Sequence, residues 1–375
     1  MRGVAAVRAG VWLIGGMAAT LMAGCPESPV PPGGTGDSNV VEDSPSVPPG
    51  DPGDPVDPPV EPPDGLPAAD DLSDPGDPAV KQSYLLGLEE SQGPGDHFEF
   101  DETSHWVRTS TIHGTALSVA IDRSVATDAD GWFSEEFAAF VEAAFHASWH
   151  VFGGFAFDRY AVRVRAEDGN AEFSLSPVGI TLSGADYGAP WGLEVVAHEM
   201  FHSWNGKFVR AEPDSSENLF QRETWLVEGG TVYYSFRHMA FALNVEEYRG
   251  GMGFRWETYQ QYVGTEYDLS IPDLVALIGT APPGDPSTQP QTNMLYARGA
   301  LASYMLDQEL VERGLRLDDV MRRLYLDALD GRTWRFDRLQ AVLQSITGDD
   351  FGPWLDAWID SNTPLPLDGT FDLLE

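Results

Sequence analysis

The chain has 375 residues, a net charge of −37 and one cysteine. So acidic a protein is a poor candidate for binding nucleic acid or an anionic lipid surface, because like charges repel. A single cysteine excludes a disulfide within the chain, and the length suffices for one large domain or two smaller ones.

The first 24 residues have the pattern of an export signal. Arg2 and Arg8 form a basic end, and a stretch of small apolar residues follows them. Residues 21–25, Leu-Met-Ala-Gly-Cys, resemble the lipobox of bacterial lipoproteins, in which the cysteine carries lipid after cleavage. We predict a signal peptide over 1–24 and lipidation at Cys25, with a plainly cleaved signal as the alternative. The protein is then an exported bacterial lipoprotein anchored in a membrane, in our interpretation the outer membrane, with its domain in the periplasm or at the cell surface.

A tether is predicted over 25–80. The stretch 26–80 is rich in Pro, Gly and Asp, and it holds 13 acidic side chains and no basic one. Proline fits neither a helix interior nor a central strand, and too few large apolar residues are present to form a core. We therefore predict a disordered, extended acidic linker between the lipid and a globular part.

Two stretches with alternating, β-rich residues begin the globular part, at 106–112 and 116–121. They predict a short β-rich region over 81–131. The acidic sequence at 128–131 is interpreted as a turn, because the further ligands of a calcium loop are missing. Helical patterns dominate from residue 132 onward, so the predicted fold class is α+β, with a mainly helical domain over 132–375.

A helix is predicted from Ser134, as N-cap, to Phe152, because two acidic residues follow the cap. This helix carries His146 and His150, which lie four residues apart and hence on one face. No glutamate stands beside the pair, and aromatic residues surround it. We interpret the two as packed structural histidines, with metal ligands as the alternative.

The strongest motif is His-Glu-Met-Phe-His at 198–202, inside the apolar, helix-forming stretch 193–205. On a helix, His198 and His202 share a face and can both reach one metal ion. Glu199 lies about 100° away round the helix and can reach a water bound to that ion. This arrangement is typical of zinc hydrolases, in which the metal keeps one open position.

Glu228 is the predicted third zinc ligand. It lies in the apolar run 223–236, where an unpaired carboxylate would be costly. Two histidines, one glutamate and a water complete the coordination of a catalytic zinc ion, so one Zn²⁺ is the predicted cofactor. The glycines at 229–230 allow another backbone to approach closely. Glu223 is the alternative ligand.

The rest of the chain has helical patterns. Pro272 fits the first turn of one helix, which we expect to start at Ser270. The other expected helices lie at 245–262, 293–313, 317–329, 335–346 and 351–359, with a proline-rich loop at 281–290.

The segments around these motifs resemble the glycyl aminopeptidase family of gluzincin zinc metallopeptidases. His-Glu-Met-Phe-His-Ser-Trp-Asn-Gly-Lys at 198–207 is followed by Trp-Leu-Val-Glu-Gly-Gly-Thr-Val-Tyr-Tyr at 225–234. Phe-Ala-Phe-Asp-Arg-Tyr at 155–160 resembles the strand ahead of the family's active site. Tyr-Ala-Arg-Gly at 296–299 resembles its Tyr-x-Lys-Gly helix, with Arg in place of Lys, and residues 360–366 resemble the end of its catalytic domain.

The resemblance implies a thermolysin-like fold and three zinc ligands: His198, His202 and Glu228. It also implies that Glu199 acts as general base and then as general acid. Tyr296 matches the family tyrosine that stabilises the oxyanion of the tetrahedral intermediate; from the residues alone, a core aromatic would be preferred. Glu172 stands in a degraded counterpart of the family's Gly-Gly-Leu-Glu-His segment and is the expected ligand of the substrate's amino group.

We therefore predict an enzyme that hydrolyses peptide bonds of a peptide or protein substrate with a metal-activated water, as an aminopeptidase. An endopeptidase of the same fold is one alternative, because the segment around Glu172 departs from the family. A surface-tethered, inactive peptidase-like binding protein is the other, and the presence of Glu199 argues against it. The expected membrane contact runs through Cys25, and no nucleic-acid partner is expected.

Overall fold

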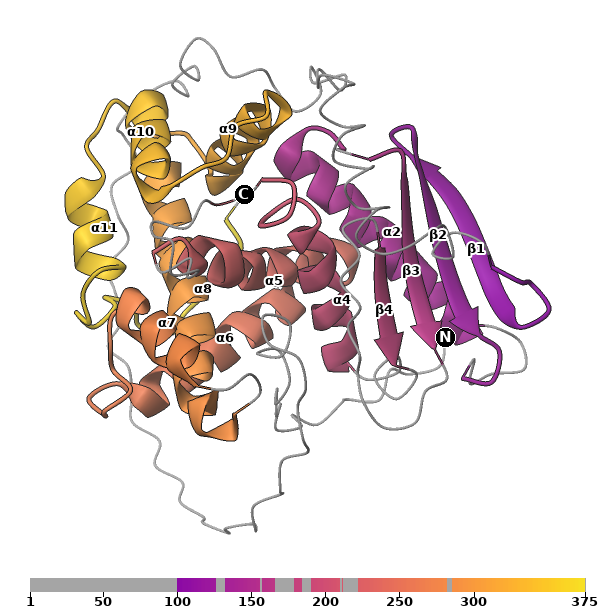
Figure 1. Ribbon diagram of the computed structural model, residues 1–375, viewed down its shortest axis with the longest axis horizontal. Helices are drawn as coiled ribbons and strands as arrows, with labels where there is room; N and C mark the ends of the chain where they lie inside the picture. The colour runs from indigo at the N-terminus through magenta and orange to yellow at the C-terminus, as the bar shows by residue number, and fades with distance from the viewer. Residues whose placement is uncertain are drawn as a thin grey trace, which may run out of the picture.

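A sheet lies along one side of the molecule, and helices form the rest (Figure 1). The structure is a computed structural model that describes residues 100–125, 132–155, 157–165, 179–183, 190–209, 211, 222–281 and 285–374. The predicted signal and tether, and with them Cys25, lie outside the described residues, as does Glu172. Within the described ranges, none of the helices combines the length and the apolar character needed to span a membrane.

The sheet has four strands in the order β1-β2-β3-β4. β1 (His105–Ile112) and β2 (Thr115–Asp122) are the two strands that the alternating stretches predicted, and they pair antiparallel. β3 (Arg159–Arg165) pairs parallel with β2, and β4 (Gly179–Ser183) pairs parallel with β3. The β-rich stretch before residue 131 therefore shares one sheet with strands that follow residue 132.

The connection between β1 and β2 is a two-residue turn, His113-Gly114. Both residues have positive φ, 47° and 86°. Such turns match the right-handed twist of the paired strands, and they favour Asn or Gly because a side chain is strained at positive φ. His113 is the one non-glycine residue with positive φ in the described part of the chain.

The predicted α+β class is confirmed, because helices follow one another after the sheet. Within the helical part, the π-helix η3 (Trp225–Gly230) runs directly into α5, and the short turn η4 (Pro286–Thr288) precedes α8. The α-helices are α2 (Trp132–Phe152), α4 (Pro190–His202), α5 (Thr231–Ala242), α6 (Val245–Tyr262), α7 (Ile271–Thr280), α8 (Gln289–Val311), α9 (Leu317–Leu329), α10 (Phe336–Thr347) and α11 (Gly352–Trp358).

The starts of α2 and α8 differ from the prediction by two residues or more. α2 begins at Trp132, so Ser134 is fully buried in its first turn and is not the N-cap. α8 begins at Gln289 and carries Pro290 in its first turn, where the missing N–H of proline costs nothing. The sequence had assigned that proline to a loop.

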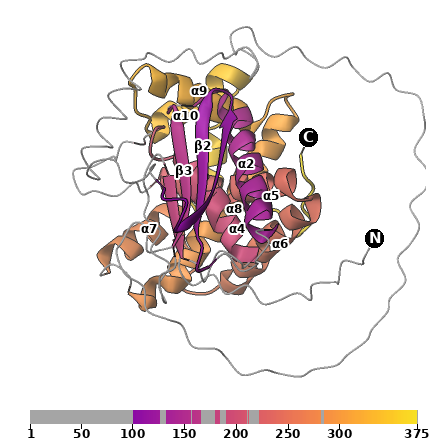
Figure 2. The ribbon, with the colours of Figure 1, turned by 90° about the vertical axis from the view of Figure 1, so that its right-hand side faces the viewer.

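α2 lies between the sheet and the other helices (Figures 1 and 2). It contacts β1 and β2 on one side and α4, α5 and α9 on the other. A cluster of buried aromatic rings fills this layer around Trp204, whose indole N–H donates to the Gly154 carbonyl at 3.0 Å. The rings of Phe145, Phe152 and Phe157 lie within 5.7 Å of the Trp204 ring, centroid to centroid. This core holds the C-terminal end of α4 against the sheet.

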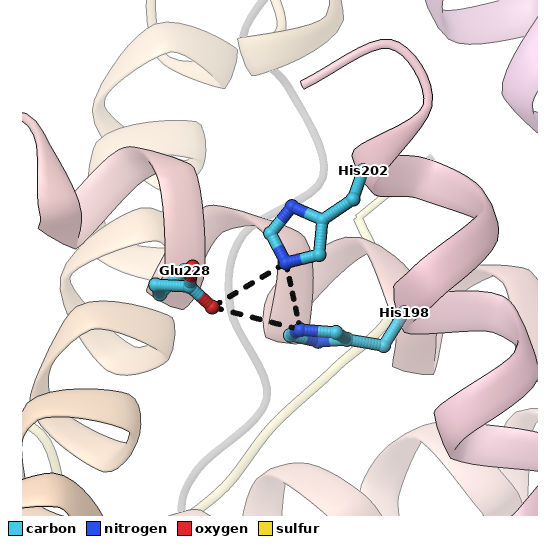
Figure 3. A group of neighbouring side chains, drawn as sticks. All are labelled: His198, His202 and Glu228. Atoms are coloured by element: carbon cyan, nitrogen blue, oxygen red, sulfur yellow. Dashed lines mark hydrogen bonds and ion pairs between the residues drawn. The ribbon is translucent and has the colours of Figure 1, made fainter. Parts of the chain in front are cut away.

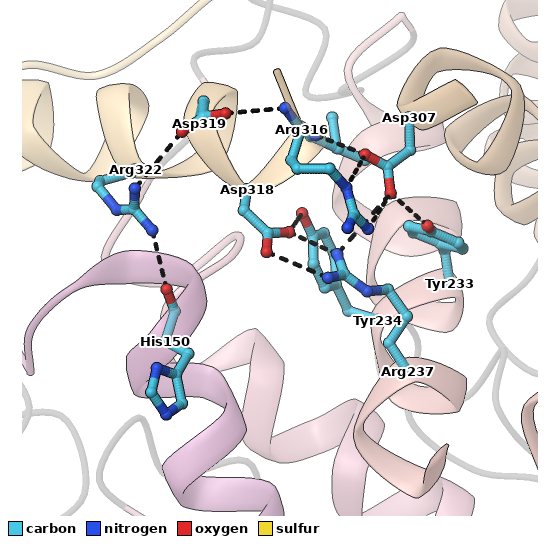
Figure 4. Close-up of polar contacts among 10 residues, drawn as sticks. His150, Tyr233, Tyr234, Arg237, Asp307, Arg316, Asp318, Asp319 and Arg322 are labelled. Carbon is cyan, nitrogen blue, oxygen red and sulfur yellow. Dashed lines mark hydrogen bonds and ion pairs between the residues drawn. The ribbon is translucent and has the colours of Figure 1, made fainter. Parts of the chain in front are cut away.

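A second set of contacts, between charged side chains, joins α5, α8 and α9 (Figure 4). Asp307 is fully buried and accepts hydrogen bonds from the Tyr233 hydroxyl, from Arg316 and from the Leu317 N–H. Nearby, Asp318 accepts two hydrogen bonds from Arg237. Buried charges are tolerated when they are paired in this way, and removing one partner is strongly destabilising.

We expect Asp318 to make the free energy of unfolding depend on pH between about pH 4 and pH 2. Burial alone would raise the pKa of Asp318, but Arg237 outweighs it and lowers this pKa from 3.8 to about 2. The carboxylate therefore stabilises the fold above pH 4, by about 2 kcal/mol, and this contribution is lost as the pH falls to about 2. The measurement is urea unfolding at pH 4 and at pH 2. The Asp318→Asn variant should lose about 2 kcal/mol less stability between these two pH values than the unaltered chain.

Asp356→Asn is the control, because the Asp356 side chain is 76% exposed. It should lose as much stability between pH 4 and pH 2 as the unaltered chain. An equal loss in Asp318→Asn and in the unaltered chain would contradict the assigned role of the Arg237–Asp318 pair.

Candidate metal centre

Three buried side chains converge between α4 and η3 (Figure 3). The Nε2 atoms of His198 and His202 lie 2.9 Å apart. Oε2 of Glu228 lies 3.3 Å from Nε2 of His202 and 3.7 Å from Nε2 of His198. In the described part of the chain, this is the one group of three such side chains whose ligand atoms lie close enough to share a metal ion.

The three donor atoms fit a zinc ion. Zinc binds histidine nitrogen and carboxylate oxygen at about 2.0–2.2 Å, which in a tetrahedron places the donors about 3.3 Å apart. The observed separations of 2.9–3.7 Å bracket that value. Three protein donors leave a fourth position for water or substrate, as in catalytic zinc sites.

The helix α4 supplies both histidines, and its end fixes the second. α4 ends at His202, and the Nδ1 atom of His202 lies 3.0 Å from the backbone oxygen of Asn205. A hydrogen bond from Nδ1–H to that oxygen selects the tautomer whose Nε2 offers a lone pair to the metal.

The side chain of Asn205 then links α4 to the segment that carries Glu228. Its amide donates to the carbonyls of Leu226 and Val227 at 2.9 and 3.2 Å, and to the Thr231 hydroxyl at 3.0 Å. Asn205 is fully buried, so these bonds are shielded from water. The sequence offered only the position of Asn205 next to the H-E-x-x-H motif, and no role was predicted from it.

Asn205→Ala is expected to weaken zinc binding by about 10–100-fold, because partners that orient metal ligands have effects of this size. The backbone oxygen that faces His202 remains, whereas the bonds that hold η3 are lost. The zinc dissociation constant can be measured by competition with a chelator.

Asn244→Ala is the matched control. Asn244 caps α6 by accepting a hydrogen bond from the Glu246 N–H, and it bonds to none of the metal ligands in that contact. It should lower stability by about 1 kcal/mol and leave the zinc dissociation constant unchanged. Equal zinc affinity in Asn205→Ala and in the unaltered chain would show that this asparagine does not position the ligands.

Glu228 lies in a π-helix, a rare winding that often marks functional sites. The predicted close approach at the adjacent glycine is confirmed. A Cβ on Gly229 would lie 2.3 Å from the backbone carbon of Gly299 in α8, so only glycine fits. This contact brings α8 close enough for the Tyr296 hydroxyl to donate to Oε2 of Glu228 at 2.9 Å. Tyr296 therefore reaches the site, as the family resemblance implied.

The charges of the site act on one another. Burial would raise the pKa of Glu228, but the neighbouring imidazoles of His202 and His198 hold it well below its usual range. Burial also opposes a charge on His202, yet the Glu228 carboxylate raises the pKa of this imidazole. Burial and the same carboxylate raise the pKa of Tyr296 well above 10, so its phenol keeps the proton that it donates.

Two further charged groups lie beside the ligands. Glu199 is 2% exposed, and its Oε2 atom has no hydrogen-bond partner among the described residues. Burial lowers the pKa of Lys207 to about 8, although the charges of Glu199 and Glu228 oppose this shift. Sequence reasoning gave no role to Lys207, whose ammonium adds a positive charge near both carboxylates.

Glu223, the alternative third ligand, lies elsewhere. It is fully buried, and its Oε1 atom accepts a hydrogen bond from the backbone N–H of Phe336, the first residue of α10, at 3.1 Å. A carboxylate at a helix start stabilises unpaired N–H groups. The structure thus brings Glu228, and not Glu223, to the two histidines.

Comparison with known proteins agrees with this geometry. The family profile described as M61 glycyl aminopeptidase matches residues 191–269. None of the curated proteins compared with the chain matches it. An aminopeptidase N family protein from Idiomarina loihiensis aligns with a TM-score of 0.57 at 18% identity, over 70% of this chain and 47% of that one. Yeast LTA4 hydrolase in complex with bestatin aligns with a TM-score of 0.52 at 18% identity, over 71% and 41%.

The chain thus spans less than half the length of either solved structure. At this identity the structural likeness concerns the fold, whereas the profile match concerns the sequence around the metal ligands. Both agree with the predicted resemblance. The chain shares the fold of the aminopeptidase N family and LTA4 hydrolase structures, and its residues 191–269 are similar to the M61 glycyl aminopeptidases.

Proposed function

We propose that the chain is a zinc-dependent peptidase that removes residues from the amino terminus of peptides. One observation carries the proposal: His198, His202 and Glu228 converge on one point beside the unpartnered carboxylate oxygen of Glu199. The family profile over this region and the fold shared with aminopeptidases support it. The cofactor is a single Zn²⁺ ion held by these three ligands.

Zinc held there would supply a Lewis acid, which polarises the peptide carbonyl and makes a bound water more acidic. Glu199 takes the proton of the attacking water and then gives it to the leaving amine. Its burial beside His198 keeps this carboxylate close to the reacting atoms. The protonated phenol of Tyr296 donates a hydrogen bond to the carbonyl oxygen as that oxygen gains negative charge.

The parts of the chain outside the described residues complete the proposal. Glu172 binds the amino group of the substrate, which would restrict cleavage to the first peptide bond. Cys25 carries lipid that anchors an exported bacterial lipoprotein to the membrane, and the acidic segment 25–80 sets the distance between lipid and catalytic domain. The support is the sequence alone, with its basic and apolar start, its lipobox-like residues and its proline-rich linker.

The test uses the full chain and a mixed set of peptides, each with a free or an acetylated amino terminus. Products are read by mass, with and without a zinc chelator. We expect single residues to be released from free termini only, and we expect the chelator to stop this release. Adding zinc back after the chelator is removed should restore it.

Two other outcomes favour the alternatives. Internal cuts that ignore acetylation would make the chain an endopeptidase and remove the assigned role of Glu172. A chain that binds zinc and cleaves none of the peptides would contradict the proposed activity and would favour an inactive binding protein on the same fold.

A further inference from the structure

Three histidines outside the metal centre form a second cluster, which the proposed function does not use. His146 and His150 lie in the last two turns of α2, and His113 lies in the turn between β1 and β2. His113 and His150 are exposed and His146 is half-buried. His150 is exposed but still packs edge-on against the ring of Trp149, with ring centroids 5.3 Å apart.

The pair on α2 repeats the geometry of the pair on α4. The Nε2 atoms of His146 and His150 lie 3.0 Å apart, compared with 2.9 Å for His198 and His202. The ring centroids lie 4.5 Å apart in both pairs, and the rings cross at 78° and 84°. Two Nε2 atoms placed in this way can meet one ion at the usual zinc–nitrogen distance of about 2.0–2.1 Å.

His113 faces the Nδ1 atom of His146, just as the backbone oxygen of Asn205 faces the Nδ1 atom of His202. Its Nε2 atom lies 2.9 Å from Nδ1 of His146. The planes of the two imidazoles lie within 8° of each other, which suits a hydrogen bond between ring edges. Metal-binding histidines almost always donate their second ring N–H to such a partner. With the proton on Nδ1, His146 presents the lone pair of Nε2 toward His150.

Both ends of the cluster are held in place. The ring of His113 stacks on Trp149, with centroids 3.7 Å apart and planes within 8°. Its backbone adopts φ 47°, a conformation that histidine tolerates better than most residues with a side chain. Arg322 donates to the backbone oxygen of His150 at 2.9 Å, and the imidazole of His150 points away from that contact (Figure 4).

We propose that His146 and His150 form a second transition-metal site at the surface, which binds a divalent cation of the zinc, nickel or copper class through their two Nε2 atoms. His113 orients His146 without touching the ion. Imidazole ligands select these metals over Mg²⁺ and Ca²⁺, which prefer oxygen. The described residues supply no third side-chain ligand at this place, so water completes the coordination.

The electrostatics of the molecule favour such binding. The net charge of −37 attracts cations to the surface.

The test is the number of Ni²⁺ equivalents bound by the full chain at pH 7, measured by titration calorimetry. Replacing both helix histidines, in His146→Gln/His150→Gln, should lower this number by one. The single variant His150→Gln changes only an exposed side chain and should lose the same equivalent, which guards against misfolding of the double variant. His105→Gln, a histidine of β1, is the control and should bind as many equivalents as the unaltered chain.

His113→Asn tests the orienting role separately, because asparagine suits the turn but removes the imidazole. This variant should keep the equivalent but weaken its dissociation constant by about 10–100-fold. Equal numbers of Ni²⁺ equivalents in the double variant and the unaltered chain would overturn the proposal. The comparison does not depend on the centre at His198 and His202, because every variant leaves that centre intact.

Discussion

Glu199→Gln is expected to lower kcat for peptide hydrolysis by about 10²–10⁴-fold while the zinc content stays at the level of the unaltered chain. An amide has nearly the size of a carboxylate but cannot accept the proton of the attacking water. The proposed zinc ligands His198, His202 and Glu228 are unchanged, so the metal should stay. The measurements are kcat with a free-amine peptide and zinc per chain by elemental analysis.

Glu194→Gln is the matched control, because it makes the same chemical change five residues earlier on α4. Glu194 is buried in an ion pair with Arg255 at 2.7 Å, so its loss should lower the stability of the fold. The kcat of the folded variant should stay near that of the unaltered chain. A Glu199→Gln variant that turns over at the normal rate would refute the assignment of Glu199 as the general base.

Tyr296→Phe is expected to lower kcat by about 10²–10³-fold, the usual cost of removing one hydrogen-bond donor to a developing oxyanion. Two roles must be separated, because the phenol donates to Glu228, the proposed third zinc ligand, in this structure. An oxyanion donor acts in the transition state, so kcat should fall with little change in KM or in zinc affinity. A residue that only orients Glu228 would instead weaken zinc binding.

Tyr304→Phe provides the comparison, since Tyr304 is a buried tyrosine two turns further along α8. Its hydroxyl accepts a hydrogen bond from Gln308, away from the metal ligands. We expect a kcat near that of the unaltered chain. A kcat in Tyr296→Phe that matches this control would make Tyr296 a structural residue.

Local patterns in the sequence predicted most of the helices and strands. α6 and α9 have the predicted bounds, and α6 begins directly after its cap, Asn244. The H-E-x-x-H spacing predicted that two imidazoles would share a helix face, and Figure 3 shows them there. Helix bounds and the spacing of the two histidines depend on residues only a few positions apart. Such local patterns can be recognised in a single sequence.

Features that depend on distant residues were not predictable in this way. The amide of Asn205 bonds to carbonyls 21 and 22 positions away, and the hydroxyl of Tyr296 donates to a carboxylate 68 positions away. The choice between Glu228 and Glu223 was also decided by tertiary contacts, because both carboxylates lie in the same apolar run. The π-helical winding of η3, which contains Glu228, has no recognisable sequence pattern.

The most direct test of the metal centre is anomalous diffraction at the zinc edge from crystals of the full chain. We predict a peak about 2.0–2.2 Å from Nε2 of His198, Nε2 of His202 and a carboxylate oxygen of Glu228. Crystals grown with zinc that show no peak at this point, or a peak coordinated by Glu223, would contradict the proposed site and the chemistry derived from it.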